Sequence, residues 1–296
     1  MNELTGNGKY MDEFERILYN NVLSSISLSG DHYSYENPLD AENNPRWNWH
    51  SCPCCPPMFL KMVAALPGFI YSYTSSEVYV NLFIGNETKI KFNNMQEVLL
   101  KQTTNYPWDG KIDISIEPNL ERVFSLKIRI PGWALGKENP YMLYHSSLKS
   151  SIKLCVNGKS VAINPNNGYM AIKRKWKKSD MVELTLPMEP RLIYANNSVK
   201  ELKNMIAIAS GPIVYCLEKY DNPELKDIRL EVNSLFKITY KPEVLNGVNI
   251  INGNALVDSS KNGYDFKQVV VSAIPFYAVG NREPGNAYEV WIPQNK

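Results

Sequence analysis

The sequence predicts a mainly β protein that begins with two helices. Between residues 10 and 27, and again after Cys55, apolar residues recur at helical spacing. From about residue 73 onward the pattern changes to short alternating runs with turn residues between them, as in antiparallel strands. Together these observations predict a helical segment followed by two antiparallel β-sandwich domains.

Each predicted helix has one apolar face. The first face is formed by Phe14, Ile17, Leu18, Val22 and Ile26. The second helix should begin with Pro56 and Pro57, because proline lacks the amide hydrogen that a helix start leaves unbonded, and should end at Pro67-Gly68. Its face is formed by Met58, Phe59, Met62, Val63 and Leu66. An apolar stripe needs a partner, so the helices either pack on the β part or belong to a larger helical domain.

The strand prediction starts from four alternating runs. These runs are residues 78–84, 112–116, 125–130 and 182–186. Asn157-Gly158 is a hairpin turn signal, and the prolines at 187 and 190 mark a seam between two β domains. Beyond the seam, residues 206–217 and 268–291 are again rich in strand formers. We therefore expect β domains at 73–188 and 189–296.

Composition excludes several classes of partner. The chain has 32 basic and 30 acidic residues and a net charge of +2, which argues against nucleic acid or an anionic membrane as the main partner. No stretch approaches the roughly 20 apolar residues that span a bilayer. No signal peptide is visible, so the compartment stays open between cytoplasm and periplasm. The sequence also leaves open whether the chain forms a homodimer.

Three of the five cysteines are crowded at Cys52, Cys54 and Cys55. Such spacing suits a metal or reactive thiols better than a disulfide framework. The adjacent pair precedes a predicted helix start, where free backbone N–H groups and the helix dipole favour thiolates. Zinc would lower their pKa further. A closed zinc knuckle that includes His50, and inert buried thiols, remain alternatives.

The segment Cys54-Cys55-Pro56-Pro57, with the helix after it and Tyr-Val-Asn-Leu at 79–82, resembles the signature of glycoside hydrolase family 127, which is related to family 146. Further blocks fit in family order. They are Glu15-Arg16-Ile17-Leu18-Tyr19-Asn20, Tyr35-Glu36-Asn37-Pro38-Leu39, Tyr106-Pro107-Trp108-Asp109-Gly110, Arg129-Ile130-Pro131-Gly132-Trp133, Gly211-Pro212-Ile213-Val214-Tyr215 and Asn281-Arg282-Glu283-Pro284-Gly285.

The resemblance implies a fold and an activity. Residues 1–72 would be the last helices of a truncated (α/α)6 catalytic barrel that precedes the two β-sandwich domains. The activity would be that of a retaining β-L-arabinofuranosidase that acts on plant-derived arabinofuranosyl glycans or glycoproteins. Its nucleophile would be a zinc-bound cysteine in place of the usual second carboxylate.

The resemblance also assigns residues. Cys54 matches the nucleophile and a zinc ligand, and Cys55 matches a zinc ligand. Tyr35 and Glu15 match substrate-binding positions; their alternatives are a core tyrosine and a helix-surface Glu15-Arg16 pair. Cys52 belongs to the signature without a role.

Parts of the family's site have no match in this sequence. The family's Glu-x-Cys zinc ligands and its separate acid/base glutamate are absent, so we expect a fragment with an incomplete site and weak zinc binding. Two rivals remain. One is a carbohydrate-binding module that uses Trp108, Trp133 and Trp176, and the other is a structural zinc protein. Cys155 and Cys216 lie in strand patterns and are expected to be buried thiols.

Overall fold

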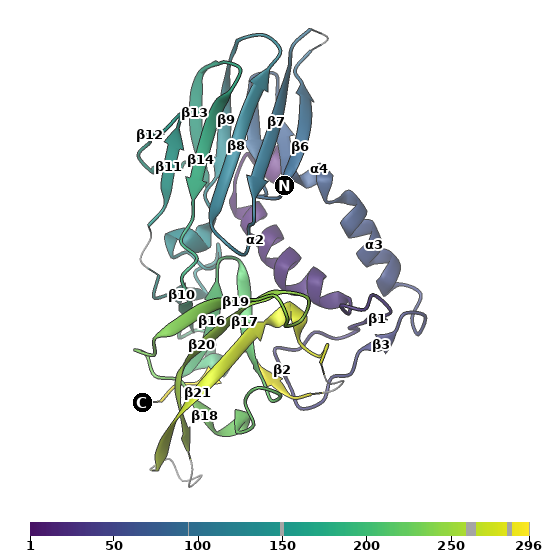
Figure 1. The fold of residues 1–296 in the computed structure, drawn as a ribbon, viewed down its shortest axis with the longest axis vertical. Helices are drawn as coiled ribbons and strands as arrows, with labels where there is room; N and C mark the ends of the chain where they lie inside the picture. Colours follow the sequence, from purple (N-terminus) through teal and green to yellow (C-terminus); the bar gives the residue numbers. More distant parts are fainter. Residues whose placement is uncertain (94, 149–150, 259–264, 283–285, 296) are drawn as a thin grey trace. The chain divides into compact units, whose positions relative to one another are not determined.

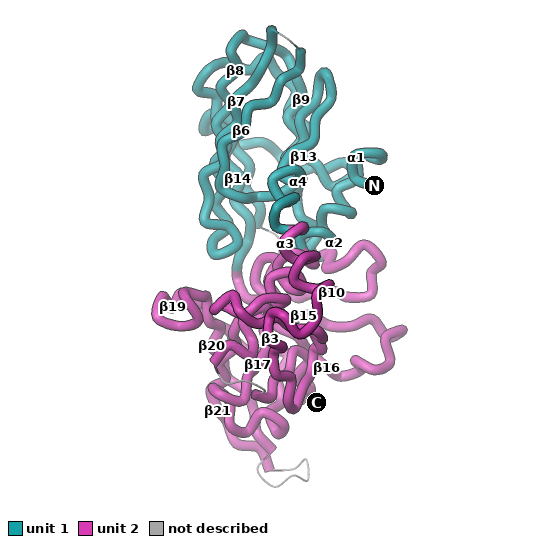
Figure 2. The backbone as a smooth tube through the Cα atoms, turned by 90° about the vertical axis from the view of Figure 1, so that its right-hand side faces the viewer, with its two compact units in different colours: residues 1–15, 63–136, 149–188 teal, residues 16–62, 137–148, 189–296 magenta. Residues whose placement is uncertain are grey.

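The computed structural model describes residues 1–296 except 94, 149–150, 259–264, 283–285 and 296 (Figure 1). Residues 283–285 of the last family block therefore lie outside the described residues. The chain forms two compact units, shown in different colours in Figure 2. Unit 1 comprises residues 1–15, 63–136 and 149–188, and unit 2 comprises residues 16–62, 137–148 and 189–296.

Both predicted helices are present. Helix α2 (Lys9–Ile17) follows the short α1 (Asn2–Thr5) and continues as a π-helical turn, η1 (Leu18–Val22), and a 3-10 turn, η2 (Leu23–Ser25). The second helix, α3, spans Cys55–Ala65. Pro67, which we expected to follow the helix end, instead starts the extra turn α4 (Pro67–Ile70), because proline suits a first helical position.

Unit 1 contains two sheets. The six-stranded sheet has the order β12-β11-β14-β8-β7-β6, and the four-stranded sheet has the order β13-β9-β5-β4. In chain order these strands are β4 (Tyr71–Tyr73), β5 (Glu77–Val80), β6 (Asn86–Lys91), β7 (Glu97–Thr104), β8 (Lys111–Pro118), β9 (Arg122–Arg129), β11 (Lys153–Val156), β12 (Lys159–Ser160), β13 (Tyr169–Trp176) and β14 (Asp180–Thr185). The alternation predicted for β8 is confirmed, since Ile112, Ile114 and Ile116 are all fully buried. Gln102 of β7 donates a hydrogen bond to Tyr71 of β4, which links the two sheets.

Two details of the strand prediction were wrong. The run at 78–84 ends as a strand at Val80, because the backbone N–H groups of Asn81 and Leu82 bond to Ile70 of α4 instead. Strand β5 also pairs with β9 in parallel, whereas we expected antiparallel pairing throughout. The chain passes through β6, β7 and β8 in the other sheet before it returns as β9, and such a crossover permits parallel pairing.

The family block at 106–110 is a structural turn. Gly110 accepts a backbone hydrogen bond from Leu186 at 2.9 Å. A Cβ atom on Gly110 would lie 2.1 Å from the Leu186 carbonyl oxygen, so only glycine fits this approach. The peptide bond between Tyr106 and Pro107 is cis.

Unit 2 contains one branched sheet of eleven strands. Its main path is β10-β15-β16-β17-β21-β20-β18, with β19, β2, β22 and β23 as side pairings. In chain order these are β2 (Asp40–Ala41), β10 (Tyr144–Ser146), β15 (Arg191–Ala195), β16 (Met205–Ser210), β17 (Ile213–Glu218), β18 (Ile228–Arg229), β19 (Phe236–Lys241), β20 (Val248–Asp258), β21 (Phe266–Pro275), β22 (Tyr288–Glu289) and β23 (Ile292–Pro293). A separate pair joins β1 (His32–Tyr33) to β3 (Trp47–Asn48).

The prediction of a mainly β chain is confirmed. Among the described residues after Ile70, helical structure is limited to 3-10 turns of three or four residues. They are η3 (Gly132–Leu135), η4 (Lys200–Leu202), η5 (Leu225–Asp227) and η6 (Phe276–Ala278). The predicted turn at Asn157-Gly158 connects β11 to β12, with both residues at positive φ. Within the described ranges no helix has the length and apolar character needed to cross a membrane.

Candidate active site

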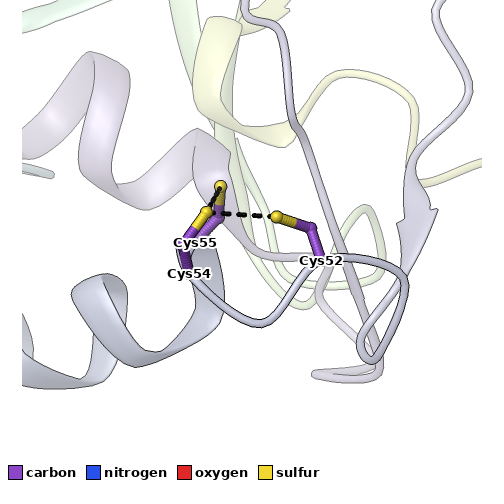
Figure 3. A group of neighbouring side chains, drawn as sticks. All are labelled: Cys52, Cys54 and Cys55. Atoms are coloured by element: carbon purple, nitrogen blue, oxygen red, sulfur yellow. Dashed lines mark hydrogen bonds between the residues drawn. The ribbon is translucent and has the colours of Figure 1, made fainter.

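The three crowded cysteines meet at the start of α3. The carbonyl of Cys54 accepts the hydrogen bond of the Met58 N–H, so Cys54 caps the helix that begins at Cys55. Its sulfur lies 3.1 Å from that of Cys52 and 3.6 Å from that of Cys55 (Figure 3). Cys52 lies in the loop before the helix, and its sulfur belongs to the same group because it is 3.1 Å from that of Cys54.

Sulfur spacing in this group fits a shared soft cation. Zinc–thiolate bonds of about 2.3 Å in a tetrahedron place neighbouring sulfurs roughly 3.8 Å apart. The three sulfurs lie within 4.8 Å of one another. Among the described residues this is the only group of three or more His, Cys, Asp or Glu side chains that is so spaced, and His50 does not belong to it. The alternative of a closed knuckle that includes His50 therefore has no support among the described residues.

Without a cation, hydrogen bonds among the thiols shift the pKa values of Cys52 and Cys54. Hydrogen bonds from Cys54, first from its backbone and then from its side chain, lower the pKa of Cys52 to about 7. Hydrogen bonds to the sulfurs of Cys52 and Cys55 raise the pKa of Cys54 to about 11. These two shifts run in opposite directions in the metal-free group, whereas coordination to a cation deprotonates every thiol bound to it.

A pocket of about 350 Å³ opens beside the sulfurs within unit 2. Its wall is largely apolar and aromatic, as in most small-molecule sites. The lining residues are Val22, Ser25, Tyr33, Ser34, Tyr35, Trp49, Cys54, Cys55, Pro56, Met58, Phe59 and Met62. The structure thus brings together three of the residues singled out in the sequence, namely Cys54, Cys55 and Tyr35. Tyr35 is 52% exposed, so it is not a core tyrosine.

An aromatic cluster beside this pocket was not predicted. Trp47 stacks on Tyr35, with ring centroids 4.6 Å apart and planes at 10°, and meets Tyr33 edge-on at 6.2 Å. Tyr33 and Trp47 are also register partners across β1 and β3. The signal for this cluster was the pair of tryptophans at 47 and 49, just before the cysteines, which the sequence analysis left unused.

Tyr33 has an unusual environment. The side chain is only 2% exposed, and its hydroxyl has no hydrogen-bond partner among the described residues. Burial raises the pKa of Tyr33, and the neighbouring thiols of Cys52, Cys55 and Cys54 add to this effect.

Glu15 lies in unit 1 and has a different environment. It is 1% exposed, which excludes the helix-surface pair with Arg16. Its carboxylate accepts hydrogen bonds from Tyr106 at 2.9 Å, from Trp133 at 3.3 Å and from Arg129. Arg129 is fully buried and also pairs with Asp12 at 2.7 Å. Although burial by itself lowers the pKa of Arg129, the charges of Glu15 and Asp12 raise it overall. This is a buried ion-pair network whose acceptors are engaged.

The remaining candidates are mostly buried. Cys216 is 2% exposed and burial raises its pKa, as expected for an inert thiol, while Cys155 is only partly buried. Trp133 and Trp176 are 7% and 0% exposed, so neither can serve as a platform for a sugar.

Three domain models of one known family together match nearly the whole chain. The β-L-arabinofuranosidase catalytic-domain model of glycoside hydrolase family 127 matches residues 1–68. The middle-domain model of that family matches residues 77–188, and the C-terminal-domain model matches residues 190–293. The chain belongs to glycoside hydrolase family 127.

Relatives of this family 127 chain are about twice as long. A non-reducing end β-L-arabinofuranosidase of Bifidobacterium longum is 26% identical over 96% of this chain and 45% of its own length. A solved family 127 β-arabinofuranosidase is 38% identical, with a TM-score of 0.92 over 98% of this chain and 46% of that one. A β-L-arabinofuranosidase from Geobacillus stearothermophilus is 33% identical, with a TM-score of 0.88 over 99% and 47%. The chain therefore spans about half the length of these relatives.

Proposed function

We propose that this chain carries the nucleophile of a retaining β-L-arabinofuranosidase, and that the nucleophile is Cys54. One observation carries the proposal: three sulfurs gather at the start of α3, and two of them line an aromatic pocket. Membership in glycoside hydrolase family 127, with relatives named β-L-arabinofuranosidases, supports the sugar and the linkage. The substrate class is then a terminal β-L-arabinofuranosyl residue on a plant-derived glycan or glycoprotein.

In this proposal the Cys54 sulfur attacks the anomeric carbon. A carbon–sulfur bond forms while the glycosidic carbon–oxygen bond breaks, and the departing oxygen takes a proton from a general acid. Water then attacks the anomeric carbon from the face that the leaving group vacated, opposite the sulfur, and gives a proton to the general base. The carbon–sulfur bond breaks, which returns the thiolate, and the two inversions together retain the configuration. None of the pocket-lining residues carries a carboxylate, so we assign no general acid within this pocket.

Zinc is the cofactor that the donor set fits. Cys54 and Cys55 would hold it, and the position of Cys52 allows a third thiolate. When bound, zinc keeps such thiols ionised near neutral pH and moderates their basicity. The capping position of Cys54 places its thiol at a helix N-terminus, which favours negative charge, whereas hydrogen bonds to Cys52 and Cys55 raise its pKa when no cation is bound.

Tyr35 is the proposed contact to the sugar. It lines the pocket with both cysteines, and its half-exposed ring is held in place by stacking on Trp47. Glu15 has less support as a sugar contact, since three donors already occupy its carboxylate. We propose instead that Glu15 holds α2 to β9 through Arg129.

We also propose the domain limits 1–72, 73–188 and 189–296, with the first segment as the end of an (α/α)6 barrel. The apolar side chains of α3 support this, because Met58, Leu60 and Val63 are 61%, 55% and 45% exposed. A helix that is apolar on more than one face is one that neighbouring elements bury, as in the interior of a helical barrel. The two sheets of unit 1 and the branched sheet of unit 2 would be the two β-sandwich domains.

Both rivals have less support. A carbohydrate-binding module would need exposed aromatic rings. Of the three tryptophans considered for it, Trp133 and Trp176 are buried and Trp108 is half-buried. A closed structural zinc site encloses its sulfurs, whereas Cys54 is exposed and lines a pocket.

The test is covalent labelling with an electrophilic β-L-arabinofuranose analogue, followed by peptide mapping. We expect label on Cys54 and none on Cys55, Cys155 or Cys216. The matched D-arabinofuranose analogue is the control for sugar recognition and should react much more slowly. Label on a carboxylate would overturn the cysteine nucleophile, and equal labelling by both sugars would overturn the substrate assignment.

A further inference from the structure

Arg46 is a charged residue of unit 2 that the proposed mechanism does not use. Its guanidinium donates hydrogen bonds to the carbonyl of Ser24 at 2.8 Å and to the carbonyl of Val279 at 3.1 Å. The third nitrogen, Nε, is buried and has no hydrogen-bond partner among the described residues. Taking a charge out of water is costly, so a guanidinium held by two uncharged carbonyls calls for a structural or functional reason.

The two carbonyls belong to segments from opposite ends of the chain. Ser24 lies in η2 and Val279 directly follows η6, and both residues are buried. The segments η2 and η6 are in contact with each other. A guanidinium is planar and carries its donors in a rigid fork, so bonds to two acceptors fix both the place and the direction of the side chain. Arg46, which immediately precedes β3, therefore ties that strand to the body of unit 2.

Trp47 extends this anchoring from Arg46 to the pocket. Its indole stacks on the ring of Tyr35, with centroids 4.6 Å apart and planes at 10°, and meets Tyr33 edge-on at 6.2 Å. Tyr35 lines the same pocket as Cys54. Contacts and one peptide bond thus connect the two buried carbonyls, through Arg46 and the indole, to a ring in the wall of the cysteine pocket.

We propose that Arg46 is a positioning residue of this site: its fork holds Trp47 in place, and the indole of Trp47 sets the position of the Tyr35 ring that contacts the sugar. This rests on the proposed function and extends it to a residue outside the pocket. A ring that is fixed before the sugar arrives lowers the ordering cost of binding. Because such a contact is made alike in the ground state and the transition state, its loss raises KM and leaves kcat unchanged.

The experiment compares Arg46→Met with the unchanged sequence in a complete enzyme that contains this chain. Methionine keeps an unbranched apolar stem and removes both hydrogen bonds. For an aryl β-L-arabinofuranoside we expect KM to rise about three- to tenfold, as for one lost contact, and kcat to stay within about twofold. Zinc content should not change, because helix α3 holds Cys54 independently of Arg46. A fall in kcat alone, an unchanged KM or a loss of zinc would each overturn the proposal.

Arg229→Met is the matched control. Arg229 is another partly buried arginine of unit 2 that donates to backbone carbonyls, those of Lys226 at 3.3 Å and Ile228 at 2.9 Å. It lies on β18 and does not line the pocket. Both substitutions remove hydrogen bonds and should lower the unfolding temperature, but Arg46→Met alone should raise KM. An equal rise of KM in both variants would mean a general loosening of unit 2, which contradicts a positioning role.

A double-mutant cycle decides whether Arg46 acts through Trp47. In a Trp47→Ala background the indole is absent, so Arg46→Met should raise KM no further. If Arg46→Met raised KM equally in both backgrounds, Arg46 would act by another route and the proposal would be wrong.

Fluorine NMR gives a second readout that does not depend on the sugar. In a chain labelled with fluorotryptophan, the resonance of Trp47 is identified by its absence from Trp47→Phe. Arg46→Met should shift and broaden this resonance, whereas Arg229→Met should leave it in place. If the unchanged enzyme does not hydrolyse the arabinofuranoside, the proposed function fails, yet the resonance still reports whether Arg46 holds Trp47. A Trp47 resonance that is the same in Arg46→Met and in the unchanged chain would overturn the positioning role.

Discussion

At the scale of single residues, the cysteines at the start of α3 differ in exposure. Cys54 is exposed, whereas Cys52 and Cys55 are partly buried, and the pocket is lined by Cys54 and Cys55. In the metal-free group Cys52 has the lowered pKa, about 7, and Cys54 the raised one, about 11. In the proposed mechanism the thiolate of Cys54 would therefore depend on a bound cation, because coordination deprotonates a thiol.

Serine variants separate these roles. Cys54→Ser should abolish hydrolysis of an aryl β-L-arabinofuranoside by a complete enzyme that contains this chain, because a serine hydroxyl stays protonated. Cys55→Ser should also lose activity, but through loss of zinc. Metal analysis by mass spectrometry checks the difference. Full zinc content in Cys55→Ser would show that Cys55 is not a ligand.

The zinc affinity of this chain depends on how many thiols participate. Two thiolates predict weak binding, and the proximity of Cys52 predicts a firmer site with one position left open. In a chelator titration, Cys52→Ser should lose zinc at a lower chelator concentration than the unchanged chain. Cys155→Ser is the matched control and should behave like the unchanged chain. Identical titration curves for all three would exclude Cys52 from the site.

At the scale of elements, periodic segments were predictable and short irregular ones were not. The apolar spacing in 10–27 and the alternation in β8, β9 and β14 extend over several repeats, so each gives a clear signal. Strands β1 and β3 have two residues each, and two residues have no period. Their pairing carries Tyr33 and Trp47 to the cysteines, which explains why the site's aromatic wall was missed. The cysteines themselves were predictable because they are adjacent in sequence.

The turn into β14 gives a prediction about pH. Burial alone would raise the pKa of Asp180, but hydrogen bonds from the Lys177 N–H and Asn157 outweigh it, and the net shift is downward from 3.8. A lowered folded-state pKa adds stability that is complete above 3.8 and is lost as the pH falls through the folded-state value. Asp180→Asn should cost about 1–2 kcal/mol at pH 7 and progressively less in acid.

Urea unfolding of both chains from pH 7 down to pH 3 measures that difference. The exposed Glu87→Gln on β6 is the control and should change stability by less than about 0.5 kcal/mol. A constant gap between Asp180→Asn and the unchanged chain at every pH would contradict the linkage, because it would mean that the charge of Asp180 contributes nothing.

At the scale of the whole molecule, burial is uneven. The sheets of both units are closely packed, with Ile114 of unit 1 and Ile251 of unit 2 fully buried. Helix α3 instead exposes Met58 and Leu60 by 61% and 55%. Apolar surface removed from water contributes roughly 25 cal/mol per Å², so uncovered apolar side chains of this kind drive association. Relatives twice as long as this chain have more polypeptide available to cover it.

Leu60→Glu tests whether α3 is an uncovered surface. Leucine and glutamate have similar helix propensity, so at an exposed position the unfolding temperature should stay within a few degrees. Binding of a hydrophobic dye and self-association in sedimentation velocity should both decrease, since the charge replaces exposed apolar surface. Leu120→Glu, at another leucine that is 57% exposed, is the matched control and should change neither readout as strongly. A collapse in stability for Leu60→Glu would mean that this leucine is packed within the chain, and the proposal that α3 is a barrel helix awaiting its neighbour would then lose its physical basis.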